Sequence, residues 1–147
     1  MKEVMIWTGA GQIGMAIARR MDFGKKLLVG DKKLENAQTM AKIMNDAGFD
    51  VVPMEMDLSS RDSIRCLIAE AQKYGEISMF VNAAGVSPSQ APIEAILKVD
   101  LYGTAVLLEE VGRVIKDGGT GVTALEVISI RICLPNARQA VRAQQMR

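Results

Sequence analysis

The sequence predicts an α/β fold in which helices cover both faces of a parallel sheet. Short continuous apolar runs recur along the chain, and such runs are typical of strands buried on both faces. Segments with apolar residues at helical spacing separate them, so that strands and helices alternate regularly. Because crossovers between parallel strands are right-handed, this alternation favours a three-layer, doubly wound sheet of the Rossmann-like kind, with strand order 3-2-1-4-5.

Apolar runs predict five strands, over residues 4–8, 26–30, 51–56, 77–81 and 122–130. A glycine cluster closes the first strand, and Asn82-Ala83-Ala84-Gly85 closes the fourth. Pro53 lies inside the third strand. Since proline cannot donate a hydrogen bond to a neighbouring strand, the third strand is expected at an edge of the sheet.

Four helices are expected between the strands, over residues 12–21, from Leu34 to the stop at Gly48, from a cap at Ser59 or Ser60 to Gly75, and over residues 93–116. In the first of them, Ile13, Ala16 and Ile17 are predicted to form the inner face. Residues 1–130 would then form one domain, and residues 131–147 a basic C-terminal tail. The tail has four arginines and no acidic residue, which fits either a partner-binding segment or a solvated terminus.

The composition excludes several classes of function. The 147 residues suit one domain, and a net charge of +1 gives no electrostatic basis for binding nucleic acid or an anionic membrane. No apolar stretch approaches the length of about 20 residues that a membrane span needs. Cys66 and Cys133 lack metal-ligand spacing, so no metal site is expected, and both are interpreted as reduced, buried thiols of a cytoplasmic protein.

Gly9-Ala10-Gly11-Gln12-Ile13-Gly14 matches the phosphate-binding pattern G-x-G-x-x-G between the first predicted strand and helix. Gly9 would permit the tight turn, Gly11 the approach of a pyrophosphate, and Gly14 close packing of helix on strand. The helix N-terminus, with Gln12 and Ile13 in its first turn, offers N–H groups to the phosphates. The alternative is a glycine-rich turn that only links the strand to the helix.

Asp31 ends the second predicted strand, twenty residues beyond Gly11. A carboxylate there can accept hydrogen bonds from both hydroxyls of the adenosine ribose, and it would repel the 2′-phosphate of NADP. NAD is therefore the predicted cofactor. Two alternatives remain open: Lys32 or Lys33 could reach a 2′-phosphate, or Asp31 could be an ordinary exposed acid of a turn.

Three segments together resemble the short-chain dehydrogenase/reductase family over roughly residues 1–130: Thr8 to Gly14, Asp57-Leu58 and Asn82 to Gly85. The usual glycine motif of that family, T-G-x-x-x-G-x-G, is one residue longer. The resemblance implies that Asp57 accepts a hydrogen bond from the adenine amino group and that the Leu58 backbone lines the adenine pocket. It also implies that Asn82, Ala83, Ala84 and Gly85 pass beside the ribose, with Asn82 also able to tie neighbouring strands together.

The resemblance does not extend to the catalytic residues. The family uses a tyrosine with a lysine four residues later and a serine upstream, and this sequence has no Y-x-x-x-K. Ser129 is either a relic of that serine or an ordinary strand-end hydroxyl. Asp100, in Val99-Asp100-Leu101-Tyr102-Gly103, replaces the asparagine of the family's V-N-L-x-G segment. No catalytic residue is therefore predicted, and a truncated or frameshifted reading frame is one hypothesis for the difference.

The sequence thus predicts the NAD-binding half of a short-chain oxidoreductase, inactive alone. The alternatives are a non-catalytic NAD-sensing module and a remnant that binds nothing tightly. A homo-oligomer is expected to form through the helix over residues 93–116, which pairs with its copy in the family. This helix has more apolar positions than one sheet-facing stripe requires: Ile96, Leu97, Leu101, Val106, Leu107, Leu108, Val111, Val114 and Ile115.

Overall fold

The computed structural model describes residues 2–87 and 89–124. Its centre is a five-stranded, fully parallel sheet in the order β3-β2-β1-β4-β5. The strands are β1 (Glu3–Thr8), β2 (Lys26–Asp31), β3 (Asp50–Glu55), β4 (Glu76–Asn82) and β5 (Thr120–Thr123). The predicted doubly wound order is confirmed, and β3, which contains Pro53, is an edge strand.

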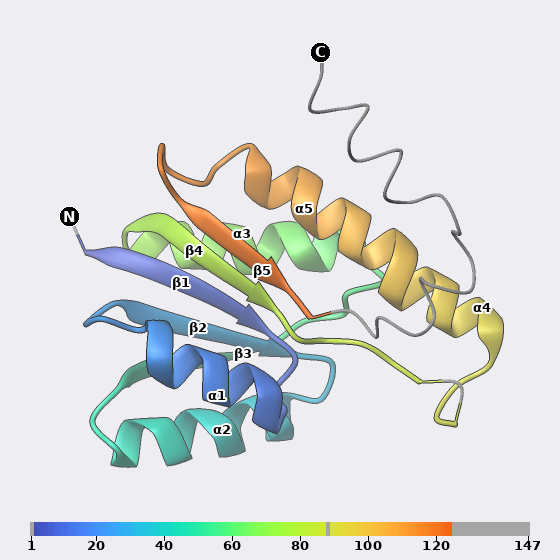
Figure 1. Ribbon diagram of the computed structural model, residues 1–147, viewed down its shortest axis with the longest axis horizontal. Helices are drawn as coiled ribbons and strands as arrows, with labels where there is room; N and C mark the ends of the chain where they lie inside the picture. Colours follow the sequence, from blue (N-terminus) through green and yellow to red (C-terminus); the bar gives the residue numbers. More distant parts are fainter. Residues whose placement is uncertain (1, 88, 125–147) are drawn as a thin grey trace.

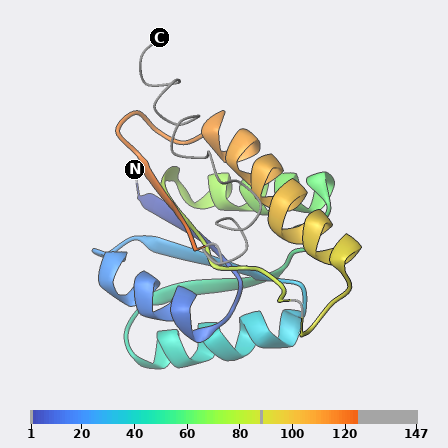
Figure 2. The same ribbon diagram turned by 45° about the vertical axis from the view of Figure 1, so that its right-hand side comes forward.

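Helices cover both faces of the sheet, which gives the molecule three layers (Figure 1). Helices α1 (Gln12–Met21) and α2 (Leu34–Asp46) lie on one face. The other face carries α3 (Arg61–Tyr74) and a long helix made of three consecutive segments: α4 (Ile93–Ile96), the π-helical segment η1 (Leu97–Gly103) and α5 (Thr104–Gly112). Figure 2 shows the two helical layers separated by the sheet. No helix among the described residues has the length and apolar character needed to cross a bilayer.

The alternation of side chains along β1 divides the core into two clusters. Val4 and Ile6 pack on the side of α3 and α5, whereas Met5 and Trp7 pack on the side of α1 and α2. All four side chains are fully buried. Because consecutive strand residues face opposite sides of a sheet, a continuous apolar run is required where both faces are covered.

The predicted inner face of the first helix is wrong at one position. Ile13 is 67% exposed, and the buried residues of α1 are Gly14 and Ala18. The reason is the contact between α1 and β1: a Cβ atom on Gly14 would lie 2.0 Å from Trp7 Nε1. The helix therefore rests on the strand through its glycine, and Ile13, one position earlier, faces away.

Three other expectations are also corrected. The α-helical conformation of the long helix ends at Gly112 rather than Lys116, and a π-helical segment interrupts it. The fifth strand begins at Thr120, two residues before its predicted start, and residues 125–130 of the predicted strand lie outside the described residues. Cys66 is exposed rather than buried. Ser129, Cys133 and the tail over residues 131–147 also lie outside the described residues.

Candidate functional site

A cleft of about 600 Å³ opens where the turns that follow the first four strands meet. Parallel strands place their carboxyl ends at one edge of the sheet, and ligands of doubly wound proteins bind in the crevice outside that edge. Eight of the predicted site residues line the cleft: Gly9, Gly11, Asp31, Asp57, Leu58, Ala83, Ala84 and Gly85. Gln12, Ile13, Gly14 and Asn82 are not part of its lining.

The glycine turn has the shape that a phosphate-binding loop needs. Gly9 has φ +84°, in the left-handed region, and a Cβ atom there would lie 2.5 Å from Ala84 N. Gly11 is the N-cap of α1 and provides no side-chain cap, and nothing lies within 4 Å of the position its Cβ would take. The first N–H groups of the helix therefore border open space beside a backbone that a ligand can approach closely.

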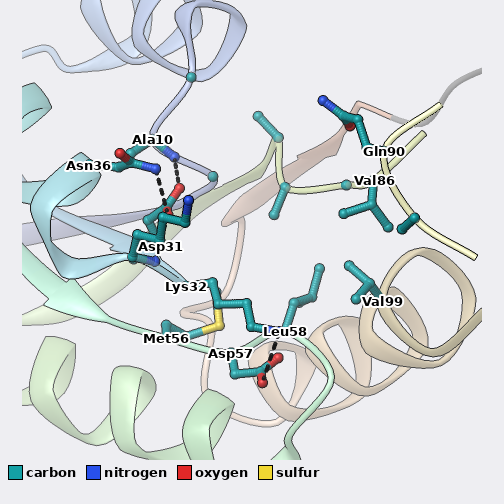
Figure 3. Close-up of a pocket in the computed structure, with 18 of the residues that line it drawn as sticks. Ala10, Asp31, Lys32, Asn36, Met56, Asp57, Leu58, Val86, Gln90 and Val99 are labelled. Carbon is teal, nitrogen blue, oxygen red and sulfur yellow. Dashed lines mark hydrogen bonds and ion pairs between the residues drawn. The ribbon is translucent and has the colours of Figure 1, made fainter. Parts of the chain in front are cut away.

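Asp31 connects the glycine turn to the end of β2. Its Oδ2 accepts a hydrogen bond from Ala10 N at 2.9 Å. Its Oδ1 accepts from Lys33 N at 2.9 Å and from Asn36 Nδ2 at 3.3 Å. Figure 3 shows Ala10 and Asn36 converging on this carboxylate at one side of the cleft. Three donors thus hold an acidic group beside the phosphate turn.

Asp57 follows β3 and lies on the same cleft. Ser59 donates to its Oδ1 twice, from N at 2.9 Å and from Oγ at 2.7 Å, while Lys32 Nζ lies 3.8 Å from its Oδ2. Partial burial acts to raise the pKa of Asp57. The hydrogen bonds from Ser59 and the charges of Lys32 and Lys98 outweigh burial, so the pKa lies below its ordinary value. At neutral pH Asp57 is therefore an ionised hydrogen-bond acceptor.

Asn82 is fully buried and joins three elements. Its Oδ1 accepts from Thr8 Oγ1 at 2.7 Å and from Ala84 N at 3.3 Å, and its Nδ2 donates to Thr104 Oγ1 at 3.2 Å. Thr8 ends β1, Asn82 ends β4, and Thr104 begins α5. The Asn82 side chain therefore joins β1, β4 and α5 next to the cleft without lining it.

The far side of the cleft includes residues that were not predicted to line it: Val86, Gln90, Ala91, Ala95 and Val99. Figure 3 shows Val86, Gln90 and Val99 opposite Asp31 and Asn36. Asp100, within the π-helical segment, accepts a hydrogen bond from Val86 N at 3.0 Å and so joins the long helix to this side. Among these lining residues only Val99 belongs to a segment that resembles the family, and the proline-containing loop after β4 is the other signal that the chain returns to the strand ends.

On the near side, the cleft is also lined by three residues that the motifs do not identify, Gly30, Met56 and Asn36. Gly30 and Met56 occupy the ends of two predicted strands, so the rule that ligands bind at carboxyl ends could have identified them. Asn36 lies in the first turn of α2, within reach of the carboxylate of Asp31.

A parallel doubly wound sheet, an open glycine turn at a helix N-terminus and an acidic side chain at the end of the next strand define a nucleotide-binding domain of the Rossmann-like class. Comparison with known proteins gives the family. The family model described as short chain dehydrogenase matches residues 2–140. The chain belongs to the short-chain dehydrogenase/reductase family.

Individual relatives agree with this assignment. The chain is 38% identical over 121 residues to the short-chain dehydrogenase/reductase bsc3 of Alternaria brassicicola, and the match covers 82% of this chain and 44% of that protein. It is 28% identical over 148 residues to carbonyl reductase [NADPH] 1 of Mus musculus, covering 93% and 53% of the two chains. The match to bsc3 extends the resemblance beyond the glycine turn to most of this chain.

Solved structures share the fold. A short-chain dehydrogenase/reductase from Burkholderia phymatum in complex with NAD superposes with a TM-score of 0.75 at 21% identity, covering 86% of this chain and 50% of that one. A glucose/ribitol dehydrogenase from Brucella melitensis gives a TM-score of 0.71 at 23% identity, covering 84% and 58%. The chain thus spans about half the length of the relatives it matches.

Proposed function

We propose that this chain binds NAD in the cleft and constitutes the cofactor-binding half of a short-chain oxidoreductase. The observation that carries the proposal is the hydrogen bond from Ala10 N to Asp31 Oδ2, at 2.9 Å. This hydrogen bond joins the glycine turn, which would face the pyrophosphate, to the acid that would face the adenosine ribose. The adenosine diphosphate part of NAD needs both groups side by side. Bound NAD would supply the hydride-accepting nicotinamide. The chain's own residues bind and orient its adenosine diphosphate.

Each part of the cleft suits one part of the cofactor. The N–H groups at the start of α1 face the phosphates, and the carboxylate of Asp31 has remaining lone pairs for the ribose hydroxyls. The ionised Asp57 can accept from the adenine amino group, beside the backbone of Leu58. Ala83, Ala84 and Gly85 leave room for the sugar because their side chains are small. None of these roles requires a metal ion.

NAD rather than NADP is the proposed cofactor because Asp31 is acidic and the ammonium group of Lys32 lies beside another acid. Lys32 Nζ is 3.8 Å from Asp57 Oδ2. A 2′-phosphate at the ribose would therefore meet a like charge first. The names of the relatives allow both cofactors, since one solved structure holds NAD and the mouse reductase is named for NADPH.

Calorimetric titration with NAD and NADP tests the cofactor assignment. NAD should bind more tightly than NADP, and Asp31→Ala should narrow or reverse this preference, because it removes both the ribose acceptor and the repulsion of the 2′-phosphate. Glu35→Ala, which removes an exposed acid from α2, is the matched control and should leave the ratio unchanged. An Asp31→Ala variant with the wild-type ratio would refute the role of Asp31.

We also propose that this polypeptide alone binds the cofactor without dehydrogenase turnover, since neither Tyr74 nor Tyr102 has a lysine four residues later. Purified protein with NAD and simple or cyclic alcohols should produce no NADH above background. Cofactor reduction that Asp100→Ala abolishes would overturn this expectation. An NAD-sensing module remains the alternative, and a partner whose affinity for the chain changes with NAD would favour it.

The partner we propose is a second copy of the chain. Four apolar side chains of the long helix are exposed: Ile93, Leu97, Leu101 and Leu108. They recur at intervals of four and seven residues, which places them along one side of the helix. Val106, Leu107 and Val111 face the core instead. The helix therefore has a second apolar face that the sheet does not cover, as an interface requires.

A further inference from the structure

Trp7 lies directly beneath the glycine turn. It is the single tryptophan of the chain, it is fully buried, and it is the penultimate residue of β1. Its indole Nε1–H donates a hydrogen bond of 2.7 Å to the carbonyl oxygen of Gly9, and the first turn of α1 rests on the same ring at Gly14. One side chain therefore contacts both ends of the phosphate-binding motif from inside the protein.

The hydrogen bond to Gly9 fixes one particular peptide group. The peptide between Gly9 and Ala10 is trans, so its C=O and N–H point in opposite directions. The C=O points inward to Trp7 Nε1, and the N–H points to Asp31 Oδ2. Rotation of this peptide would break both hydrogen bonds at once. The indole and the carboxylate thus hold it from its two sides.

Gly9 makes such a restraint necessary. A glycine at φ +84° can move to other backbone conformations at little steric cost, whereas any other residue there would be strained. Gly11 also has no neighbour within 4 Å of its missing Cβ, so side-chain packing does not hold the turn at that position. The direction of the next N–H groups depends on the orientation of the peptide that Trp7 holds.

We infer that Trp7 is a positioning residue for cofactor binding: its indole N–H orients the Gly9–Ala10 peptide, and with it the phosphate-facing N–H groups of the turn. This inference rests on the proposed function, because it assigns Trp7 a role at the same cleft. Trp7 is not part of the cleft lining and acts through the turn alone.

The test compares ADP, which has the pyrophosphate, with adenosine, which lacks it, by NMR titration of the full chain. Trp7→Phe keeps a buried aromatic ring and removes the N–H donor. The variant should bind ADP about fivefold to tenfold more weakly, the range for losing one buried hydrogen bond, and adenosine with a clearly smaller loss. Met44→Ala is the control, because Met44 belongs to the same apolar cluster and is equally buried but lies outside the cleft lining.

A purely structural role for Trp7 predicts a different pattern, in which Trp7→Phe and Met44→Ala both lower stability and both leave the ratio of ADP to adenosine affinity unchanged. That result would overturn the inference. Incorporation of benzothienylalanine at position 7 keeps the shape of the indole and replaces its N–H by sulfur, so it tests the hydrogen bond if Trp7→Phe does not fold. It should reproduce the selective loss for ADP.

The wild-type chain gives an independent readout, because one tryptophan yields one indole N–H resonance. Saturating ADP should shift this resonance more than saturating adenosine does, and equal shifts would contradict a connection between Trp7 and the phosphates. Failure of the proposed function would look different: the unmodified chain would bind neither NAD nor ADP. Wild-type binding with an unaltered ADP to adenosine ratio in both Trp7 variants would refute only the positioning role.

Discussion

Three glycines lie so close to neighbouring atoms that no side chain would fit at their positions. Gly9, Gly14 and Gly103 would each place a Cβ atom within 2.5 Å of a neighbouring atom, namely Ala84 N, Trp7 Nε1 and Leu58 O. The first two belong to the recognised turn. Gly103 ends the π-helical segment, where the absence of a side chain lets the long helix approach the loop after β3.

Gly103→Ala should therefore destabilise the protein, because the new methyl group would lie 2.4 Å from the backbone oxygen of Leu58, which cannot rotate away. We expect a loss of roughly 1–3 kcal/mol in the free energy of unfolding, the usual cost of overpacking, and weaker binding of NAD. Urea denaturation of the variant and wild type measures the first effect.

Gly112→Ala is the matched control for that substitution. Gly112 is the last residue of α5, and nothing lies within 4 Å of its missing Cβ. Alanine there should be neutral or slightly stabilising, since it restricts the unfolded chain and favours the helix. Equal stabilities of the two variants would contradict the close approach at Gly103.

Residue roles could be predicted from the sequence where a motif fixes the backbone. Gly9, Gly11 and Gly14 were found because the spacing of glycines encodes a turn, and Asp31 because it stands at a known distance from that turn. Ile13 was misplaced because its motif position says nothing about the rotation of α1. Trp7 carries no such signal, because a tryptophan in an apolar strand is, from sequence alone, only a core residue.

At the scale of elements, α3 and α5 are joined by a network of opposite charges. The side chain of Glu110 is buried. Its carboxylate accepts a hydrogen bond from Arg61 and lies 3.1 Å from Arg65 Nη2. Glu109 pairs with Arg61 at 2.9 Å and also with Arg113. Hydrogen bonds from Arg65 and Arg61 to Glu110, and from Arg61 to Glu109, hold the pKa values of both carboxyl groups below their ordinary range.

Lowered pKa values imply that acid weakens the contact between α3 and α5. A carboxyl group whose pKa is lower in the folded than in the unfolded chain stabilises the fold above the ordinary pKa of about 4.3, and this contribution is lost as the pH falls through the lowered value. The urea midpoint should therefore fall as the pH is taken from 7 to about 3.

The double variant Glu109→Gln/Glu110→Gln should show a smaller fall, because amides do not titrate in this range. Glu94→Gln, which changes an exposed glutamate of α4, should behave like the wild type. If the double variant lost as much stability in acid as the wild type, the network would not be the source of the pH dependence.

Strands were easier to predict than the long helix. Each strand of a doubly wound sheet is an apolar run between turn residues, and β1 to β4 follow these signals closely. The interruption of the long helix by η1 has no signal of this kind, because its apolar spacing continues through it. Two of its residues make tertiary contacts that the sequence does not signal, Gly103 with Leu58 and Asp100 with Val86.

For the whole molecule, the exposed apolar face of the long helix predicts self-association. Leu101→Glu would place a charge at its centre, where the wild-type side chain is 67% exposed. Light scattering should show a dimer or larger assembly for the wild type and a monomer for this variant. Ile43→Glu is the control, because Ile43 is an exposed apolar residue of α2, on the opposite face of the sheet, and its substitution should leave the assembly intact.

A monodisperse species of 15.9 kDa for the wild type, at tens of micromolar and without binding of a hydrophobic dye, would defeat this expectation. So would a Leu101→Glu variant that associates as the wild type does. The architecture itself was predictable, because alternation of strands and helices leaves few topologies. The sequence also predicts self-association through the long helix, but it cannot say which apolar positions face solvent, because apolar residues look alike in the sequence whether they face the core or solvent.

The position of β1 in the sheet determines when the cleft can form as the chain is synthesised. This strand is made before the other four, yet it lies between β2 and β4, and Thr8 pairs with Asn82 across the sheet. The backbone N–H of Ala83 donates to Thr8 O, and Gly9 packs against Ala84. A growing chain therefore carries the glycine turn long before the segment that shapes it. The cleft can therefore form only after the chain has been made as far as Ala84, because contacts between residues more than seventy positions apart complete it.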